Sequence, residues 1–348
     1  MTSLTRISVT ARKIIRYSVF FVIFLIIAKI LFDLGSGIYR KVFPAPPPPP
    51  TVSFGKLSKL PFPEAQKPNL TYSLETAEGG LPTLPTQAKV FFMPKLSANL
   101  LSLDVAKNNA SGLNFNPAEQ EVSQTVYKFA HKANPQTLEI NIVTGVFSIS
   151  YDLKADSSPI QRRPPSPEVA ASLVRAYLSS AELLPEDLSG PTTHEFLKIE
   201  GDKFVFAVSL SESQLVKVNL FRKTYDNLPV FTPDPNTANV WFMVGGAQER
   251  DKQVIAGQFH YFPVDESQSS TYPIKTAQEA WDELNAGQAF VAAPGLNKDG
   301  DKVTIRKIYL GYFDPGTPTE FFQPLVVFEG DRGFMAYLPA VTPQYYGD

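Results

Sequence analysis

The stretch TAQEAWDELNAG (276–287) and the three apolar runs that follow it decide the expected fold. Thr276 and Glu279 form a capping box, and an apolar stripe containing Trp281 follows, which predicts an amphipathic helix that buries one face. The apolar runs predict antiparallel strands over 303–313, 321–329 and 333–339, with turns marked by Asp299-Gly300 and Gly330-Asp331. They read TIRKIYLGYFDP (304–315), FFQPLVVFEGD (321–331) and GFMAYLPAV (333–341).

The same order of a capped helix and a hairpin is expected at two earlier places. Asn116, Pro117 and Glu119 resemble a helix start, so a first helix is expected from 116 until Asn134-Pro135, with His131 at its C-terminal end. Strands over 138–142 and 147–151 would follow it. Ser166-Pro167 opens the second helix, whose apolar residues recur at i, i+3, i+4, i+7 and i+8 from Ala170.

Further strands are predicted from alternation and turn residues, at 70–74, 89–92, 195–200, 203–210, 214–224, 239–244 and 253–263. Helices that each precede antiparallel strands are typical of α+β folds. The expected fold class is therefore α+β, with an N-terminal transmembrane helix followed by helix-plus-antiparallel-sheet units.

The N-terminus carries the clearest functional signal. YSVFFVIFLIIAKILFDL (17–34) is 18 residues long, and an α-helix of that length spans about 27 Å, close to a hydrocarbon core. Residues 1–43 hold seven basic residues and one acid, Asp33. Four of these bases precede the apolar run, which predicts a cytoplasmic N-terminus and an extracytoplasmic body. A cleaved signal peptide, favoured by Gly35-Ser36-Gly37, and a buried soluble helix are the alternatives.

The body is expected to begin after a stiff spacer. The run PAPPPPP (44–50) favours extended polyproline II, which suits a spacer better than an SH3-type ligand here. The expected divisions are a basic cytoplasmic segment (1–16), the transmembrane helix (17–34), a Pro-rich linker and extended segment (35–94), and three α+β units (95–160, 161–270 and 271–348).

Composition excludes several classes of protein. With no cysteine among 348 residues, there is no disulfide framework, thiolate zinc site or cysteine nucleophile. Beyond residue 43 the chain carries 25 basic and 33 acidic residues. A mildly acidic body of this kind is a poor partner for nucleic acid.

The C-terminal stretches 276–287, 304–315, 321–331 and 333–341 resemble PepSY-like domains. The placement of such units behind one anchor is also similar to that of the YycH/YycI-type regulators, which act on a cell-wall sensor kinase. The resemblance implies a regulatory or inhibitory protein and carries no catalytic residue. The long Pro-rich segment and an additional N-terminal unit depart from that pattern.

The search for chemistry finds no catalytic signature, cofactor motif or metal motif. The chain has no P-loop, HExxH, nucleophile elbow or dinucleotide fingerprint, and its three histidines, His131, His194 and His260, are far apart in sequence. NKDGD (297–301) imitates the start of a calcium loop but has Lys302 where glycine is required, so a polar turn is expected. Asp265 and Glu266 are expected to be solvated acids in a loop.

The segment YDNLPVFTPDPNTAN (225–239) is the first candidate for binding a partner, because loops carry function more often than cores do. A Pro-stiffened connection between strands is the alternative. The candidate residues are Arg222, Lys223, Tyr225, Phe231 and Asp234.

These patterns favour a single-pass, bacterial, extracytoplasmic binding or regulatory module without catalytic activity. Its expected partners are membrane lipid, through the helix, and another envelope or membrane protein. A structural or assembly factor of the cell envelope is the first alternative. An extracytoplasmic hydrolase whose acids converge in the fold is the second.

Overall fold

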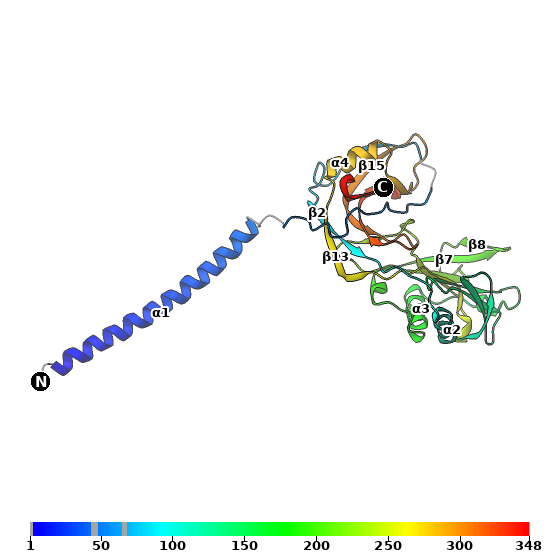
Figure 1. Cartoon of the computed structure of the whole chain (residues 1–348), viewed down its shortest axis with the longest axis horizontal. Coiled ribbons are helices and arrows are strands. Elements are labelled where there is room, and N and C mark those ends of the chain that lie inside the picture. The colour runs from blue at the N-terminus through cyan, green and yellow to red at the C-terminus, as the bar shows by residue number, and fades with distance from the viewer. Residues whose placement is uncertain (1–2, 43–47, 65–67, 348) are drawn as a thin grey trace. The chain divides into compact units, whose positions relative to one another are not determined.

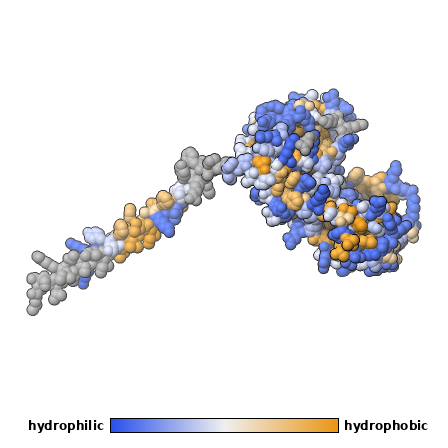
Figure 2. All heavy atoms as spheres, viewed as in Figure 1, coloured by the Kyte–Doolittle hydropathy of each residue, from blue (hydrophilic) through white to orange (hydrophobic). Residues whose placement is uncertain are grey.

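The computed structural model describes residues 3–42, 48–64 and 68–347, which form two compact units, Met1–Pro49 and Pro50–Asp348. The first unit is one helix, α1 (Ser3–Val42). Its segment Arg16–Ser36 has a mean hydropathy of 2.3 and is nowhere buried, and Figure 2 shows it as an apolar band. This segment is long and apolar enough to cross a membrane, although a signal sequence would have the same properties.

The second unit is an α+β body with three sheets (Figure 1). The largest is a nine-stranded sheet in which every neighbouring pair is antiparallel. Its strands, in spatial order, are β3 (Phe115–Glu121), β4 (Val126–His131), β5 (Gln136–Asn141), β6 (Phe147–Tyr151), β12 (Val254–Phe259), β11 (Val240–Val244), β9 (Leu215–Leu220), β7 (Thr192–Glu200) and β8 (Lys203–Phe206).

Two helices, α2 (Ser102–Gly112) and α3 (Pro167–Ser180), cover one face of this sheet. Alternate strand residues pack beneath them, among them Phe129, Ile149 and Phe242, each 3% exposed or less. Successive side chains of a strand point to opposite faces of the sheet. The residues that alternate with these buried ones therefore point away from α2 and α3, and we call that side of the sheet its open face. The strands expected in the first two units thus build one continuous sheet.

A second sheet has six strands and packs against α4 (Ala277–Asn285). Its strands are β1 (Thr71–Leu74), β15 (Lys302–Phe313), β17 (Pro324–Gly330), β18 (Met335–Pro339) and β14 (Phe290–Ala293), with β10 (Val230–Phe231) also paired to β15. The short strands β1 and β10 run parallel to β15, and the other pairs are antiparallel.

The third sheet joins distant parts of the chain. It contains β13 (Asp265–Pro273), β2 (Gln87–Phe92) and β16 (Phe321–Phe322). The extended segment after the Pro-rich run lies beside this third sheet. The Val52 amide in that segment donates a hydrogen bond to the carbonyl of Thr271, in β13, at 3.0 Å. Short 3-10 helices lie at Ser158–Ile160 (η1), Glu186–Ser189 (η2), Arg250–Lys252 (η3), Asp331–Gly333 (η4) and Pro343–Tyr345 (η5).

The helix expected from residue 116 does not form. That stretch is the hairpin β3–β4, and the helix of this part of the body, α2, precedes it. Asn116 accepts a bond from the Ala118 amide at 3.1 Å, and Glu119 pairs with Lys107 at 3.0 Å, so neither caps a helix. The side chains of Tyr127 and Phe129, two positions apart, instead both pack in the core beneath α2 and α3. Burial at every second position is typical of a β-strand.

The other two expected helices are present. α3 begins at Pro167 with Ala170, Val174 and Leu178 buried, and α4 has the complete capping box of Thr276 and Glu279. Trp281 is half-buried rather than inside the core.

Two further expectations are corrected. The expected strand 321–329 is split at Gln323 into β16 and β17, which belong to different sheets. Asp265 and Glu266 begin β13 instead of lying in a loop, because β13 pairs with β2 and places Asp265 opposite Phe92.

Candidate functional site

The expected partner-binding residues lie where the nine-stranded sheet meets the other sheets. Arg222 follows β9 and is 4% exposed, and Tyr225 is 1% exposed. The Arg222 guanidinium pairs with both Asp187, in η2, and Asp314, just after β15. It also donates to the Phe262 carbonyl at 2.6 Å. Neither Arg222 nor Tyr225 is therefore available to a partner on the surface, which corrects these two assignments.

The guanidinium of this buried cluster stays protonated. Burial alone lowers the pKa of Arg222, but the carboxylates of Asp314 and Asp187 outweigh it and raise that pKa above its usual range. Burial, and then the hydrogen bond from the Tyr225 hydroxyl to Asp187 at 2.6 Å, raise the pKa of Tyr225. The adjacent cavity has a volume of only about 10 Å³. The cluster joins sheets and leaves no space for a substrate.

The other three expected residues are more accessible but are not brought together into one site. Lys223 pairs with Glu266 of β13 at 2.6 Å. Phe231 belongs to β10 and packs against Tyr309 and Tyr337. Asp234 is exposed and accepts a bond from the Asn236 amide at 2.9 Å. The segment thus resembles the Pro-stiffened connection that was the alternative.

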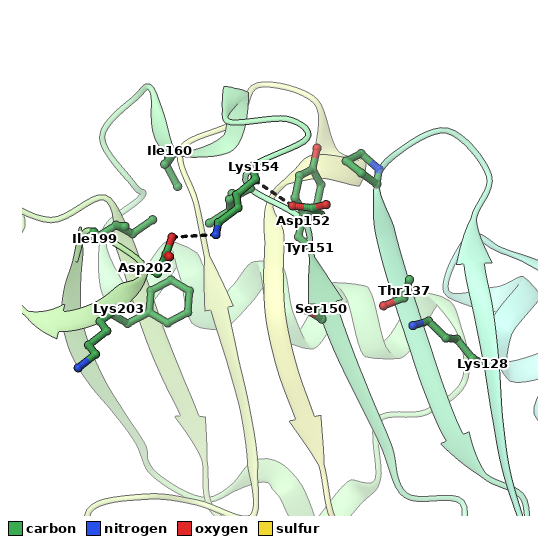
Figure 3. Close-up of a pocket in the computed structure, with 14 residues that line it drawn as sticks. Lys128, Thr137, Ser150, Tyr151, Asp152, Lys154, Ile160, Ile199, Asp202 and Lys203 are labelled. Atoms are coloured by element: carbon green, nitrogen blue, oxygen red, sulfur yellow. Dashed lines mark hydrogen bonds and ion pairs between the residues drawn. The ribbon is translucent and has the colours of Figure 1, made fainter. Parts of the chain in front are cut away.

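A broad cavity of about 660 Å³ lies at one end of the open face of the nine-stranded sheet (Figure 3). Thr137 and Ser150, from β5 and β6, contribute hydroxyl groups to it. Apolar side chains from Ile160, Ile199 and Phe204 line another part of it. The cavity therefore offers polar and apolar surfaces side by side.

A pair of charged side chains also lines this cavity. Lys154, from the segment after β6, points toward Asp202, in the turn between β7 and β8, and the two pair at 3.0 Å (Figure 3). Both side chains are largely exposed, so the pair is weak and exchangeable.

Tyr151 and Asp156 are fixed beside this cavity. The Tyr151 hydroxyl donates to Asp156 at 2.7 Å, and Lys252 pairs with the same carboxylate at 3.0 Å. Burial, followed by Asp156, raises the pKa of Tyr151, whereas hydrogen bonds from Ser158 and then Tyr151 lower the pKa of Asp156. At neutral pH the tyrosine stays protonated and the carboxylate ionised, so the pair holds the segment after β6 in place.

A second cavity, of about 320 Å³, contains His131 and Tyr177 between the sheet and the ends of α2 and α3. His131 ends β4 rather than a helix, and its Nδ1 accepts bonds from the Ala133 and Asn134 amides, each at 3.1 Å. Burial lowers its pKa, in spite of the nearby Asp251 carboxylate. The imidazole is thus neutral and serves first to hold the turn after β4.

The region of NKDGD forms a turn held by its own side chains. Asp301 accepts from the Lys298 amide at 3.0 Å and pairs with Arg332 at 3.4 Å, while Asp299 accepts from the Asn69 amide at 3.1 Å. Across residues 3–42, 48–64 and 68–347, no three His, Asp or Glu residues are grouped so that they can hold a metal ion.

Sequence reasoning missed the cavity and the partners of Arg222. Asp187 and Asp314 lie 35 and 92 positions from Arg222, so no local pattern connects them. The alternation of Phe204 and Phe206 after the Gly201-Asp202 turn did predict a strand over 203–210, but it did not show that Phe204 lines a cavity. That alternation predicts a strand with one apolar face.

Comparisons with known proteins show likeness only at the level of coarse architecture. No family model matches the chain, and no curated protein matches it. An uncharacterised protein from Eubacterium rectale is 12% identical with a TM-score of 0.39, covering 74% of this chain and 84% of its own. The YpeB C-terminal domain of Bacillus megaterium is 12% identical with a TM-score of 0.33, covering 72% and 95%.

Proposed function

We propose that this protein is a single-pass, membrane-anchored, extracytoplasmic binding module that regulates another envelope or membrane protein and has no catalytic activity of its own. The carrying observation is the separation of an unburied apolar helix segment, Arg16–Ser36, from a body that has its own cores. An apolar helix of this length is costly in water, and a bilayer removes that cost.

The basic residues before the helix favour a cytoplasmic N-terminus. In that orientation the body, which follows the Pro-rich run 44–50 in the sequence, lies outside the cytoplasm. The body, with its open sheet face and mixed cavity, then shares a compartment with other proteins of the envelope. The PepSY-like resemblance of the C-terminal stretches is in keeping with a regulatory role.

Two alternatives remain distinguishable by experiment. A structural factor of the envelope would bind wall polymer, and purified cell wall would then sediment the body. A hydrolase would need acids that converge in an accessible site. Asp187 and Asp314 do converge, but Arg222 occupies the space between them. We expect screens with ester, peptide and glycan substrates to stay at background.

Membrane fractionation of the full chain tests the anchor. We expect the protein to remain in the membrane pellet after alkaline carbonate extraction and to keep its N-terminal residues when its mass is measured. A chain beginning at residue 50 should be soluble. A mature protein that starts near Gly35-Ser36-Gly37 would show a cleaved signal peptide and contradict the anchor.

A further inference from the structure

The free edge of β8 is the least protected surface of the nine-stranded sheet. β8 is the last strand of the sheet, next to β7 (Figure 1). Phe204 and Phe206 of this strand are 46% and 74% exposed, and Val208, two residues after its end, is 91% exposed. Large apolar side chains at alternate positions of an edge strand are unusual in a soluble protein, because such an edge can pair with another strand.

The backbone of β8 is open along the same edge. The register places Val205 opposite Lys198 and Phe206 opposite Leu197, and the Ala207 amide donates to the Phe196 carbonyl at 2.8 Å. In an antiparallel ladder the residues that face the neighbour alternate with those that face away. The amide and carbonyl groups of Phe204 and Phe206 therefore point outward, and β7 is the only strand beside β8 in the described part of the chain.

The opposite edge of the sheet is protected. There β3 carries Pro117, Glu119 and Glu121, and its pairing with β4 is interrupted between Phe115 and Glu119. Proline, charge and irregular pairing all discourage the addition of another strand. The two edges of one sheet thus differ in the features that decide whether a strand can dock.

We propose that β8 pairs antiparallel with β8 of a second copy of this chain, about a two-fold axis through Val205. Phe204 of each copy then lies opposite Phe206 of the other, and Val205 lies opposite itself. The axis passes through the middle of 203–207, the stretch that is regularly paired to β7. Aromatic residues directly opposite each other stabilise such a pair, and a two-fold interface is the common form of self-association.

Charge does not oppose this self-pairing. Within 203–207 each copy contributes a single charged side chain, Lys203, which lies opposite the uncharged Ala207 of the other. The two Lys203 residues are four positions apart along the ladder, about 13 Å, which is beyond the screening length of physiological salt. No like charges stand opposite each other in this register of β8.

The size of the contact indicates where the dimer forms. Two short strands bury far less than the roughly 800 Å² per partner of a stable interface. Two copies confined to one membrane have a high effective concentration, which compensates for a weak contact. The location of the dimer therefore rests on the proposed function, whereas the register of β8 does not.

The absence of cysteine makes the test direct. The full chain carrying Val205→Cys is oxidised in its membranes. Directly opposed residues in a non-hydrogen-bonded antiparallel pair have Cα atoms about 4.5 Å apart, within disulfide range. We expect a disulfide-linked dimer. Val208→Cys is the matched control, because it is more exposed but lies beyond the paired stretch 203–207, so this register does not place it opposite its counterpart.

Cross-linking of Val205→Cys but not of Val208→Cys supports the proposed register of β8. Equal cross-linking of both variants shows nonspecific contact, and disulfide linkage of Val205→Cys to a different protein shows another occupant; either result overturns the proposal. Adding Phe206→Lys to Val205→Cys should lower dimer yield about tenfold, since a charge on an edge strand discourages pairing. Fractionation of the same sample reports the anchor separately.

Discussion

The guanidinium of Arg222 donates its Nε–H to Oδ2 of Asp314 at 2.6 Å, across 92 positions of the chain. This contact joins the end of β9 to the residue that follows β15, and both side chains are buried. The same guanidinium pairs with Asp187. The arrangement of the nine-stranded and six-stranded sheets therefore depends on a buried ion pair as well as on hydrophobic packing.

Replacing Arg222 by methionine should be strongly destabilising. It leaves two buried carboxylates without a counter-charge, and breaking a buried pair in this way costs about 3–5 kcal/mol of unfolding free energy. Arg306→Met is the matched control, since Arg306 also pairs with two acids, Glu75 and Asp331, but is exposed. That change should cost below about 1 kcal/mol. Equal urea midpoints for the two variants would contradict the assigned role of Arg222.

Stability should fall at alkaline pH because of buried tyrosines. Burial raises the pKa of Tyr225, Tyr312 and Tyr337 in the folded chain above the usual value of about 10. As the pH rises, these hydroxyls ionise in the unfolded chain before they ionise in the folded one. The stability that they contribute to the folded chain is therefore complete below pH 10 and is lost as the pH rises further. Urea midpoints between pH 8 and 11 should decrease. Tyrosinate absorbance of these residues at pH 10 in a folded chain would refute this.

Stability should also fall below about pH 6.5. Burial lowers the pKa of His131 and His260, so the unfolded chain takes up protons first as the pH decreases. The stability that the two neutral histidines contribute is complete above their pKa in the unfolded chain and is lost as the pH falls below that value. His131→Asn should weaken the pH dependence of the urea midpoint between pH 7.5 and 5.5. A raised pKa for His131, measured by NMR, would reverse the sign and contradict the account.

The buried face of α4 should matter more than its exposed face. Leu284 is 1% exposed, so Leu284→Ala should cost about 2–5 kcal/mol. Trp281 is half-buried, and Trp281→Ala should cost less than the 3–5 kcal/mol typical of a fully buried tryptophan. Gln278→Ala, on the exposed face, should stay within about 0.5 kcal/mol. Urea melts that show a larger loss for Gln278→Ala than for Leu284→Ala would mean that α4 packs differently.

The sequence predicted a helix correctly where a helix-start signal and an apolar stripe occur together. α3 and α4 each combine a start signal with an apolar stripe, and both helices are present. At 116–133 the apolar residues fit a helical period, yet Tyr127 and Phe129 fit a period of two equally well. Pairing with β5 decided between them. Local periodicity does not contain that information.

Two features could not be predicted because they depend on distant residues. β13 has few apolar residues and is a strand through its pairing with β2. The expected partner-binding role of Arg222 failed because a charged residue beside a loop is usually solvated. Here Asp187 and Asp314 neutralise it within the interior.

Labelling of single cysteines in intact cells tests the central claim, the membrane-anchored extracytoplasmic body, most directly. Leu296→Cys is a suitable site because Leu296 is 80% exposed on the body and the chain has no other cysteine. We predict that a membrane-impermeant maleimide labels Leu296→Cys in intact, outer-membrane-permeable cells, whereas Ser3→Cys reacts only after the inner membrane is opened. Labelling of Leu296→Cys only after that step would place the body inside the cell and contradict the proposed function.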